Sequence, residues 1–253
     1  MLLDLQKASI WKRVSAYLFD TILLGMVVVG IAFLLSSVLH YGAYSRTLDE
    51  AYETYETQYG VTFEITQDEF NAMTAEGQAR YNEAYEALIA DTEAMYAYNM
   101  VINLALVILT VSLLIAHLGL EFVVPLLFKN GQTLGKKIFG ICVMRTDCVK
   151  LTTVQLFVRS ILGKYTIETM IPVLILLMLY FGTVGLVGTL VLGLILLLQV
   201  IVIGVTKTNS AIHDLLAVTT VVDFHSQKIF ETTEDLIEYK KVLAAERAAR
   251  QSY

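Results

Sequence analysis

Charged residues are scarce in this sequence, and so are proline and cysteine. Of its 253 residues, 17% are charged and 56% are hydrophobic. A soluble domain of this length would need more charge to cover its surface, so the composition indicates a membrane protein. With two prolines and several long apolar runs, the chain also differs from a disordered protein.

Motifs for catalysis and cofactor binding are missing as well. The two cysteines, Cys142 and Cys148, lack CxxC spacing and a nearby histidine, which argues against a zinc or redox site. GQTLGKK (131–137) has three residues between its glycines, and Lys137 stands where a nucleotide-binding loop needs Ser or Thr. No basic tract resembles a nucleic-acid-binding arm. We therefore expect that the chain is not an enzyme, that it binds no cofactor or metal, and that it has no nucleic-acid partner.

The long apolar runs predict four transmembrane helices. Residues 14–39 form the first, which is too long for a signal-peptide core and lacks an A-x-A cleavage pattern after it. Residues 99–128 form the second. Residues 166–206 form an apolar run of 41 residues. Because one span needs about 20 residues, this run predicts two spans with a tight turn near Gly182–Gly188.

The distribution of lysine and arginine predicts the orientation of these spans. With four spans, residues 1–13, 129–165 and 207–253 lie on one side and carry 16 of the 18 basic residues. That side should be the cytoplasm, with both termini in it. With only three spans, the tail and its six basic residues would lie outside, which the preference of basic loops for the cytoplasm disfavours. Residues 40–97 hold 12 of the 24 acidic residues and should be extracytoplasmic.

The outer segment should form a small helical cap. One helical stripe carries Tyr52, Tyr55 and Tyr59, and a second carries Tyr81, Tyr85, Leu88, Thr92 and Tyr96. The tyrosines either pack the two helices together or bind a partner or ligand. Between the stripes, GVTFEIT (60–66) is strand-like, and Thr66 with Glu69 forms a capping-box pattern before a short helix. The second cap helix should run into the second span.

On the cytoplasmic side, IFGICVM (138–144) and AVTTVVDF (217–224) should form a small two-stranded patch. LTTVQLFVRSILGKY (151–165) has an apolar face and a possible capping box, which suits a helix lying in the interface. From Thr233 the tail should be a mixed-charge helix. The predicted segments are 1–39 (tail and first span), 40–98 (helical insertion), 99–128 (second span), 129–165 (loop with interfacial helix), 166–206 (third and fourth spans) and 207–253 (tail).

Polar residues occur at matched depth within the spans. Asp20, Glu121 and Gln199 each lie seven or eight residues from a basic residue at the edge of their span, about 10–12 Å along a helix. His117 lies one turn deeper than Glu121. Since such groups are costly against lipid, they should face one another. They form either a site for a monovalent cation or proton, or polar contacts that hold the helices together.

Several segments resemble those of RDD-family membrane proteins. KRVSAYLFDTILL (12–24) resembles the family's opening, with an arginine at the start of the first span and an aspartate two turns in. GQTLGKKIFGICVMR (131–145) is similar to its T-x-G-K-[RK]-x-x-G-[IL]-x-V segment, and VRSILGKY (158–165) to its arginine-containing helix. SAIHDLLAVTTVVD (210–223) resembles its closing H-D-x-x-A-x-T-x-V-V segment. The resemblance covers residues 11–39 and 99–223.

The resemblance implies that Arg13, Asp20 and Asp214 are the family's signature residues. It also implies a multi-pass protein of the bacterial cytoplasmic membrane that either transports small cations or protons or serves as an accessory subunit. We expect Arg13 to pair with Asp214 or to hold both aspartates, although Asp214 would also suit a helix cap or the surface. Because four spans leave little room for a pathway, a homo-oligomer or a partner membrane protein is expected. The cap at 40–97 is longer than a typical family loop.

Overall fold

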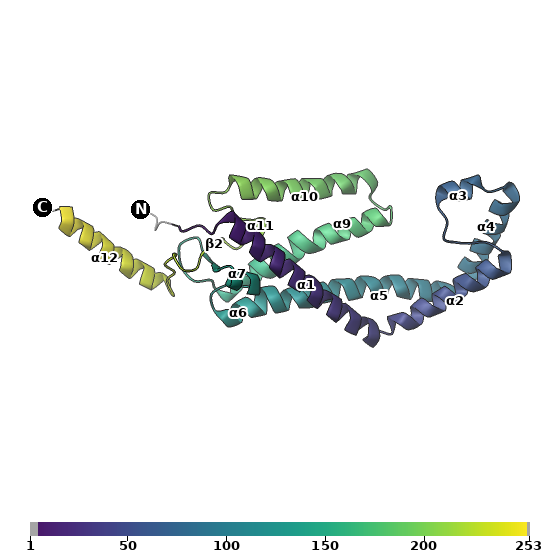
Figure 1. Cartoon of the computed structure of the whole chain (residues 1–253), viewed down its shortest axis with the longest axis horizontal. Coiled ribbons are helices and arrows are strands. Elements are labelled where there is room, and N and C mark those ends of the chain that lie inside the picture. The colour runs from purple at the N-terminus through teal and green to yellow at the C-terminus, as the bar shows by residue number, and fades with distance from the viewer. Residues whose placement is uncertain (1–4, 252–253) are drawn as a thin grey trace. The chain divides into compact units, whose positions relative to one another are not determined.

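The computed structural model describes residues 5–251, and these residues are mostly helical (Figure 1). Four helical segments are long and apolar enough to cross a membrane, which confirms the predicted number of spans: Ile10–Val38, Thr92–Phe128, Thr153–Tyr180 and Gly185–Val205. The chain divides into two compact units. One is Val29–Ser112, and the other contains the chain on either side of it.

The second span contains a π-helical turn. Helix α5 (Thr92–His117) continues through η1 (Leu118–Val123) into α6 (Val124–Phe128). Pro125 lies directly after this turn and has no N–H to give to the carbonyl of Glu121, four residues earlier. The hydroxyl of Ser160 donates to that carbonyl oxygen instead, at 2.6 Å. A neighbouring helix therefore satisfies the backbone group that proline leaves free.

The third span begins earlier than predicted. Residues 151–165 were expected to form an interfacial helix separate from a span starting at 166. Instead, α8 (Thr153–Phe157), the π-helical η2 (Val158–Met170) and α9 (Ile171–Tyr180) form one continuous helical run. The apolar face continues across the expected boundary without a helix breaker, so nothing ends the helix there. The predicted capping box is confirmed at its start, between Thr152 and Gln155.

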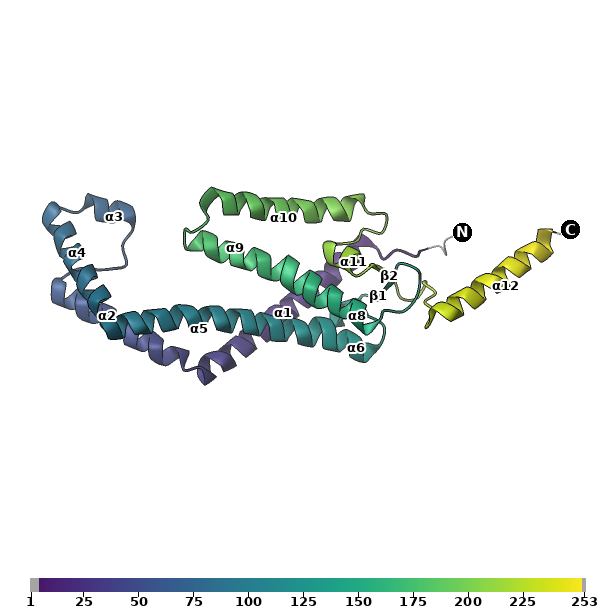
Figure 2. The same ribbon diagram turned by 180° about the vertical axis from the view of Figure 1, so that it is seen from behind.

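The third and fourth spans form a helical hairpin, as predicted. A short turn with Gly182 at φ +69° joins α9 to α10 (Gly185–Val205). Glycine reaches this left-handed backbone conformation without steric cost. The two helices lie side by side in Figure 1 and in the reverse view of Figure 2.

The predicted strand pair is also confirmed. Strand β1 (Ile141–Arg145) pairs antiparallel with β2 (Thr219–Asp223), with Ile141 opposite Asp223. Alternate side chains of β1 point to opposite faces. Ile141 and Val143 pack with Ala16 of α1 (Ile10–Val38), whereas Cys142 and Met144 pack with Leu236 of α12 (Thr233–Gln251). Burial raises the pKa of the Cys142 thiol to about 12, so this cysteine acts as a packed apolar side chain.

Two short helices complete the first unit. Helix α7 (Leu134–Ile138) precedes β1, and α11 (Ile212–Leu216) precedes β2. Lys7 forms an isolated antiparallel bridge to Val222, so the segment before α1 lies along the outer edge of β2.

The second unit contains the cap. Helix α2 (Tyr41–Tyr59) packs with α4 (Ala75–Ala90), and α3 (Gln67–Ala72) lies between them in sequence. The ring of Phe63 lies 5.7 Å from that of Tyr52 and 5.7 Å from that of Tyr81, measured between ring centroids. These contacts support the interpretation that tyrosines pack the cap helices together.

Residues 60–66 are not a strand, contrary to the prediction. Within the described chain this segment pairs with no other extended segment, and the N–H of Phe63 donates to the carboxylate of Glu56 at 2.6 Å. The capping box between Thr66 and Glu69 is confirmed. The second cap helix ends at Asp91, whose carboxylate accepts from the N–H groups of Glu93 and Ala94 and so starts α5 as a separate helix.

Candidate functional site

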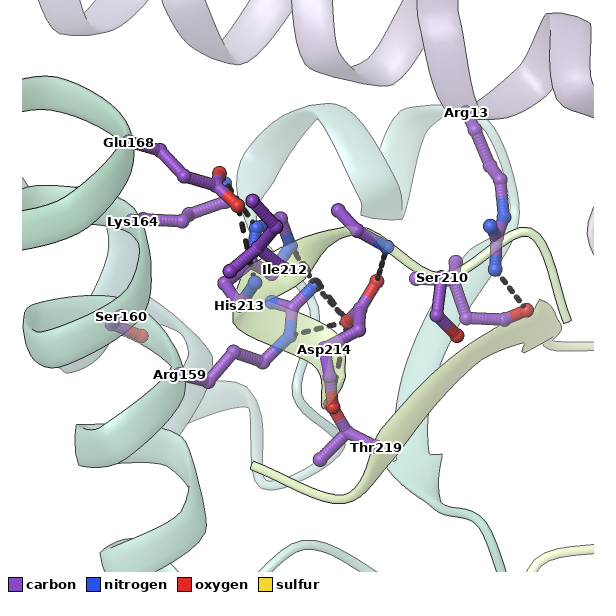
Figure 3. Close-up of polar contacts among 12 residues, drawn as sticks. Arg13, Arg159, Ser160, Lys164, Glu168, Ser210, Ile212, His213, Asp214 and Thr219 are labelled. Carbon is purple, nitrogen blue, oxygen red and sulfur yellow. Dashed lines mark hydrogen bonds and ion pairs between the residues drawn. The ribbon is translucent and has the colours of Figure 1, made fainter. Parts of the chain in front are cut away.

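Asp214 lies at the centre of a buried polar network on α11 (Figure 3). Its Oδ1 accepts a hydrogen bond from Arg159 Nε at 2.9 Å and faces Thr219 Oγ1 at 3.3 Å. Its Oδ2 accepts from the N–H of Ala211, so Asp214 also caps its own short helix. Burial alone would raise the pKa of Asp214, but the charges of Arg159, His213 and Arg13 hold it well below its usual range.

Arg13 does not form the predicted ion pair. Its two terminal nitrogens donate to the backbone carbonyls of Asn209 and, at 2.9 Å, Val221. Figure 3 shows Arg13 directed to the loop before α11, while Arg159 reaches Asp214 from η2. The prediction that Arg13 pairs with Asp214 or holds both aspartates is therefore wrong. Arg159, which is only 2% exposed, takes that role.

The contacts of His213 define its protonation state. Its Nδ1 lies 2.8 Å from Glu168 Oε2, and its Nε2 lies 3.1 Å from Arg159 Nη2. A guanidinium can only donate, so Nε2 must be the acceptor and Nδ1 must carry the proton that is donated to Glu168. His213 is therefore neutral in this arrangement. Burial lowers its pKa, although the neighbouring carboxylates of Asp214 and Glu168 oppose that effect and Arg159 adds to it.

Gln199 connects the fourth span to this network. Its side-chain amide donates to Glu168 Oε1 at 3.1 Å, and its side-chain oxygen faces the N–H of Ile212 at 3.4 Å. Glu168 also accepts from the backbone N–H of His213 at 3.1 Å. Glu168 was not among the predicted site residues. A carboxylate within the apolar run 166–206 is the same signal that identified Asp20 and could have found it.

Asp20 binds the start of α7. Its Oδ2 accepts from Thr133 Oγ1 at 2.5 Å, and its Oδ1 accepts from the backbone N–H of Gly135 at 2.7 Å. Lys136 Nζ lies 3.7 Å from Oδ2. Burial, and next the charge of Lys164, lower the pKa of Lys136 to about 8. Asp20 therefore fixes the segment 133–136 against the first span.

Glu121 and His117 contact η2. Glu121 Oε1 pairs with Lys164 Nζ at 2.6 Å, whereas its buried Oε2 has no hydrogen-bond partner among the described residues. His117 Nδ1 lies 2.9 Å from the carbonyl oxygen of Leu113, one turn earlier, and its ring packs edge-on against Tyr165. Thr169 Oγ1 lies 3.4 Å from His117 Nε2.

The four residues predicted to form one intramembrane cluster thus lie in separate contact groups. Asp20 contacts α7, Glu121 and His117 contact η2, and Gln199 contacts Glu168. Each of the three carboxylates on the spans, those of Asp20, Glu121 and Glu168, has a lysine or histidine beside it. Among the described residues, no group of three or more His, Cys, Asp and Glu side chains is placed to bind a metal ion.

A cavity of about 430 Å³ adjoins these groups within the first unit. Its polar side chains come from η2, α7, α10 and α11, from the loop before α11 and from the start of α1, and the remaining wall is apolar. The charged and polar side chains in its lining are Arg13, Lys136, Arg159, Lys164, Glu168, Gln199, Asn209, His213 and Asp214. A volume of this size is typical of a site for a small molecule.

Comparison with known proteins identifies the family of this chain. The model of the RDD family matches residues 7–218 of the chain. Searches of curated proteins and of solved structures gave no match. The matched region contains Arg13, Asp20 and Asp214, each of which joins segments far apart in sequence. The chain, a multi-pass membrane protein with four apolar helices, belongs to the RDD family.

Proposed function

We propose that this chain is a transport protein of the bacterial cytoplasmic membrane and that the ion it exchanges is the proton. In this proposal both termini lie in the cytoplasm, and the cap lies outside. Since four spans leave little room for a pathway in one copy, the transporting unit is an oligomer. The proposal assigns no catalytic role to any residue.

The observation that carries the proposal is the His213–Glu168 pair in the cavity wall. Both side chains line the cavity, and their 2.8 Å contact joins a carboxylate to an imidazole. Glu168 lies within the third span and His213 lies on α11, and histidine and carboxylate side chains are the groups that relay protons in membrane proteins. Gln199 and the backbone of α11 hold Glu168 in position.

The same contacts favour a proton over a metal cation. Asp20, Glu121 and Asp214 each lie beside a lysine or arginine. These fixed positive charges repel a bound sodium or potassium ion. A proton needs only one acceptor atom, which the Glu168–His213 pair supplies.

Proton uptake is coupled to the network by geometry. His213 Nε2 accepts from Arg159, so it cannot bind a proton while that hydrogen bond exists. Protonation at Nε2 therefore displaces Arg159 from His213 and changes the cationic side of the cavity. Proton exchange at His213 would therefore move Arg159 in the wall of the cavity, where a transported solute would bind.

Replacing Glu168 with glutamine tests the proton site. Glutamine can still accept from His213 Nδ1 but cannot take up a proton, so we expect proton flux in proteoliposomes under a pH gradient to fall at least tenfold. The control is Glu238→Gln on the exposed face of α12, which should leave the flux unchanged. Unchanged flux in Glu168→Gln, with normal yield of folded protein, would refute this assignment.

A second function, as an accessory subunit that binds a partner through the cap, is favoured by the exposed acidic surface of the second unit. Aromatic side chains pack inside the cap, whereas most of its carboxylates are exposed. Ten of the twelve acidic residues there are exposed: Asp49, Glu50, Glu53, Glu64, Asp68, Glu69, Glu76, Glu83, Glu86 and Glu93. This surface is available to a protein with a basic face.

Deleting residues 45–95 separates the two functions. The rings of Tyr44 and Tyr96 lie 6.0 Å apart, so a short glycine-serine linker can rejoin the chain there. A transporter should keep its proton flux after the deletion, because the cavity lies entirely in the other unit. An accessory subunit should lose its copurifying membrane partner, as measured by pull-down from native membranes. Loss of flux with a folded first unit would contradict the transport proposal.

A further inference from the structure

Arg13 is a cation without a carboxylate partner. Its terminal nitrogens bind two backbone carbonyls, and its buried Nε has no hydrogen-bond partner among the described residues. Within that part of the chain, no ion pair joins it to an acidic side chain. Backbone carbonyls position the guanidinium but do not neutralise it, so Arg13 brings a full positive charge to the cavity wall.

Three more cations line the cavity. Lys136, Arg159 and Lys164 are part of its lining, and each lies beside a carboxylate, that of Asp20, Asp214 and Glu121 respectively. Arg13 is thus the cation of the lining that no carboxylate of the described residues pairs with, and its charge makes the polar end of the cavity suited to an anion.

The rest of the cavity is apolar and open. Ile10, Val14 and Tyr17 of α1 and Leu196 of α10 line it, and each keeps between 42% and 61% of its surface exposed. These helices are membrane spans, so their exposed faces meet acyl chains. A ligand that fills the cavity must therefore have a charged end and an apolar end.

We propose that this cavity binds an anionic phospholipid, with the phosphodiester beside Arg13 and the acyl chains against α1 and α10. Arginine forms paired hydrogen bonds with phosphate oxygens, and Arg13 Nε donates to no acceptor among the described residues. Basic pockets between membrane helices recognise anionic headgroups in the same way. This inference goes beyond the proposed transport, because binding is measured without flux.

The test uses the full chain in non-ionic detergent with phosphatidylglycerol, phosphatidylcholine or inorganic phosphate as the probe. Native mass spectrometry should show phosphatidylglycerol binding at least tenfold tighter than phosphatidylcholine. Arg13→Gln should weaken phosphatidylglycerol binding at least tenfold, because glutamine lacks the charge. Lys207→Gln, an exposed cation at the end of α10 outside the cavity lining, should change it less than twofold.

A second variant covers the outcome in which Arg13→Gln does not fold. Ile195→Trp fills the apolar part of the cavity and leaves every charge in place, so it should reduce phosphatidylglycerol binding at least tenfold. Leu197→Trp, on the same helix but outside the lining, is its matched control. Equal binding of the two lipids, or an unaffected Ile195→Trp variant, would overturn the proposal. Competition by millimolar inorganic phosphate alone would also overturn it, because the ligand would then be a free anion.

Discussion

Arg159→Met is expected to lower the free energy of unfolding by about 3–5 kcal/mol, because it leaves the Asp214 carboxylate buried without a cation. Asp214 is 3% exposed, and Arg159 is its nearest positive partner, at 2.9 Å. Arg13 does not take over this role, since its terminal nitrogens are bound to backbone carbonyls. Chemical unfolding of the purified protein in detergent, followed by circular dichroism, measures the loss.

The double variant Arg159→Met/Asp214→Asn provides the control for this prediction. Asparagine keeps an oxygen to cap Ala211 and removes the negative charge, so most of the lost stability should return. If the double variant is as unstable as Arg159→Met alone, then lost packing of Arg159, rather than an unpaired carboxylate, causes the loss.

Gly135→Ala is expected to cost at least about 1–3 kcal/mol, the usual cost of overpacking a filled interior. A methyl group at Gly135 would lie 2.5 Å from the carbonyl oxygen of Ala16 and 2.9 Å from the carboxylate of Asp20. Both atoms belong to α1, so the clash is relieved only by moving α7 away from that helix. The movement breaks the bonds from Thr133 and Gly135 to Asp20. Unfolding in detergent again measures the change.

Gly25→Ala is the matched control for this substitution. It also adds one methyl group to the first unit, but nothing lies within 4 Å of the new atom. Alanine within a helix is favoured over glycine by about 0.5–1 kcal/mol, so stability should hold or rise slightly. If both variants lose the same stability, the close approach of α7 to α1 is not what requires glycine at residue 135.

Local sequence patterns predicted the elements of this fold well. Long apolar runs identified the four spans because each span must be apolar along about 20 residues. The β-rich segments at 138–144 and 217–224 identified the two strands. Thr66 and Thr152 identified two helix starts, because a capping box involves residues only three apart.

The contacts between side chains on different helices were harder to predict. Spacing along a helix gives the depth of a side chain but not which neighbouring helix it faces. Asp20, Glu121 and Gln199 have similar depths, yet they contact α7, η2 and Glu168 respectively. Arg13 was expected to bind a carboxylate, and backbone carbonyls satisfy it instead. The π-helical turns also left no pattern that predicted them, since they depend on contacts between helices.

The contacts of α1 have a consequence for the order of synthesis. The first span is made early, but its partners come late, since 208 residues separate Arg13 from Val221 and 113 separate Asp20 from Thr133. At a synthesis rate of about 5–20 residues per second, Val221 is made about 10–40 s after Arg13. The carboxylate of Asp20 lacks its partner Thr133 for about half of that time, and the charge of Arg13 lacks Val221 for all of it. The nascent first helix therefore needs a hydrated or protein-lined place at the membrane until the last strand closes the structure.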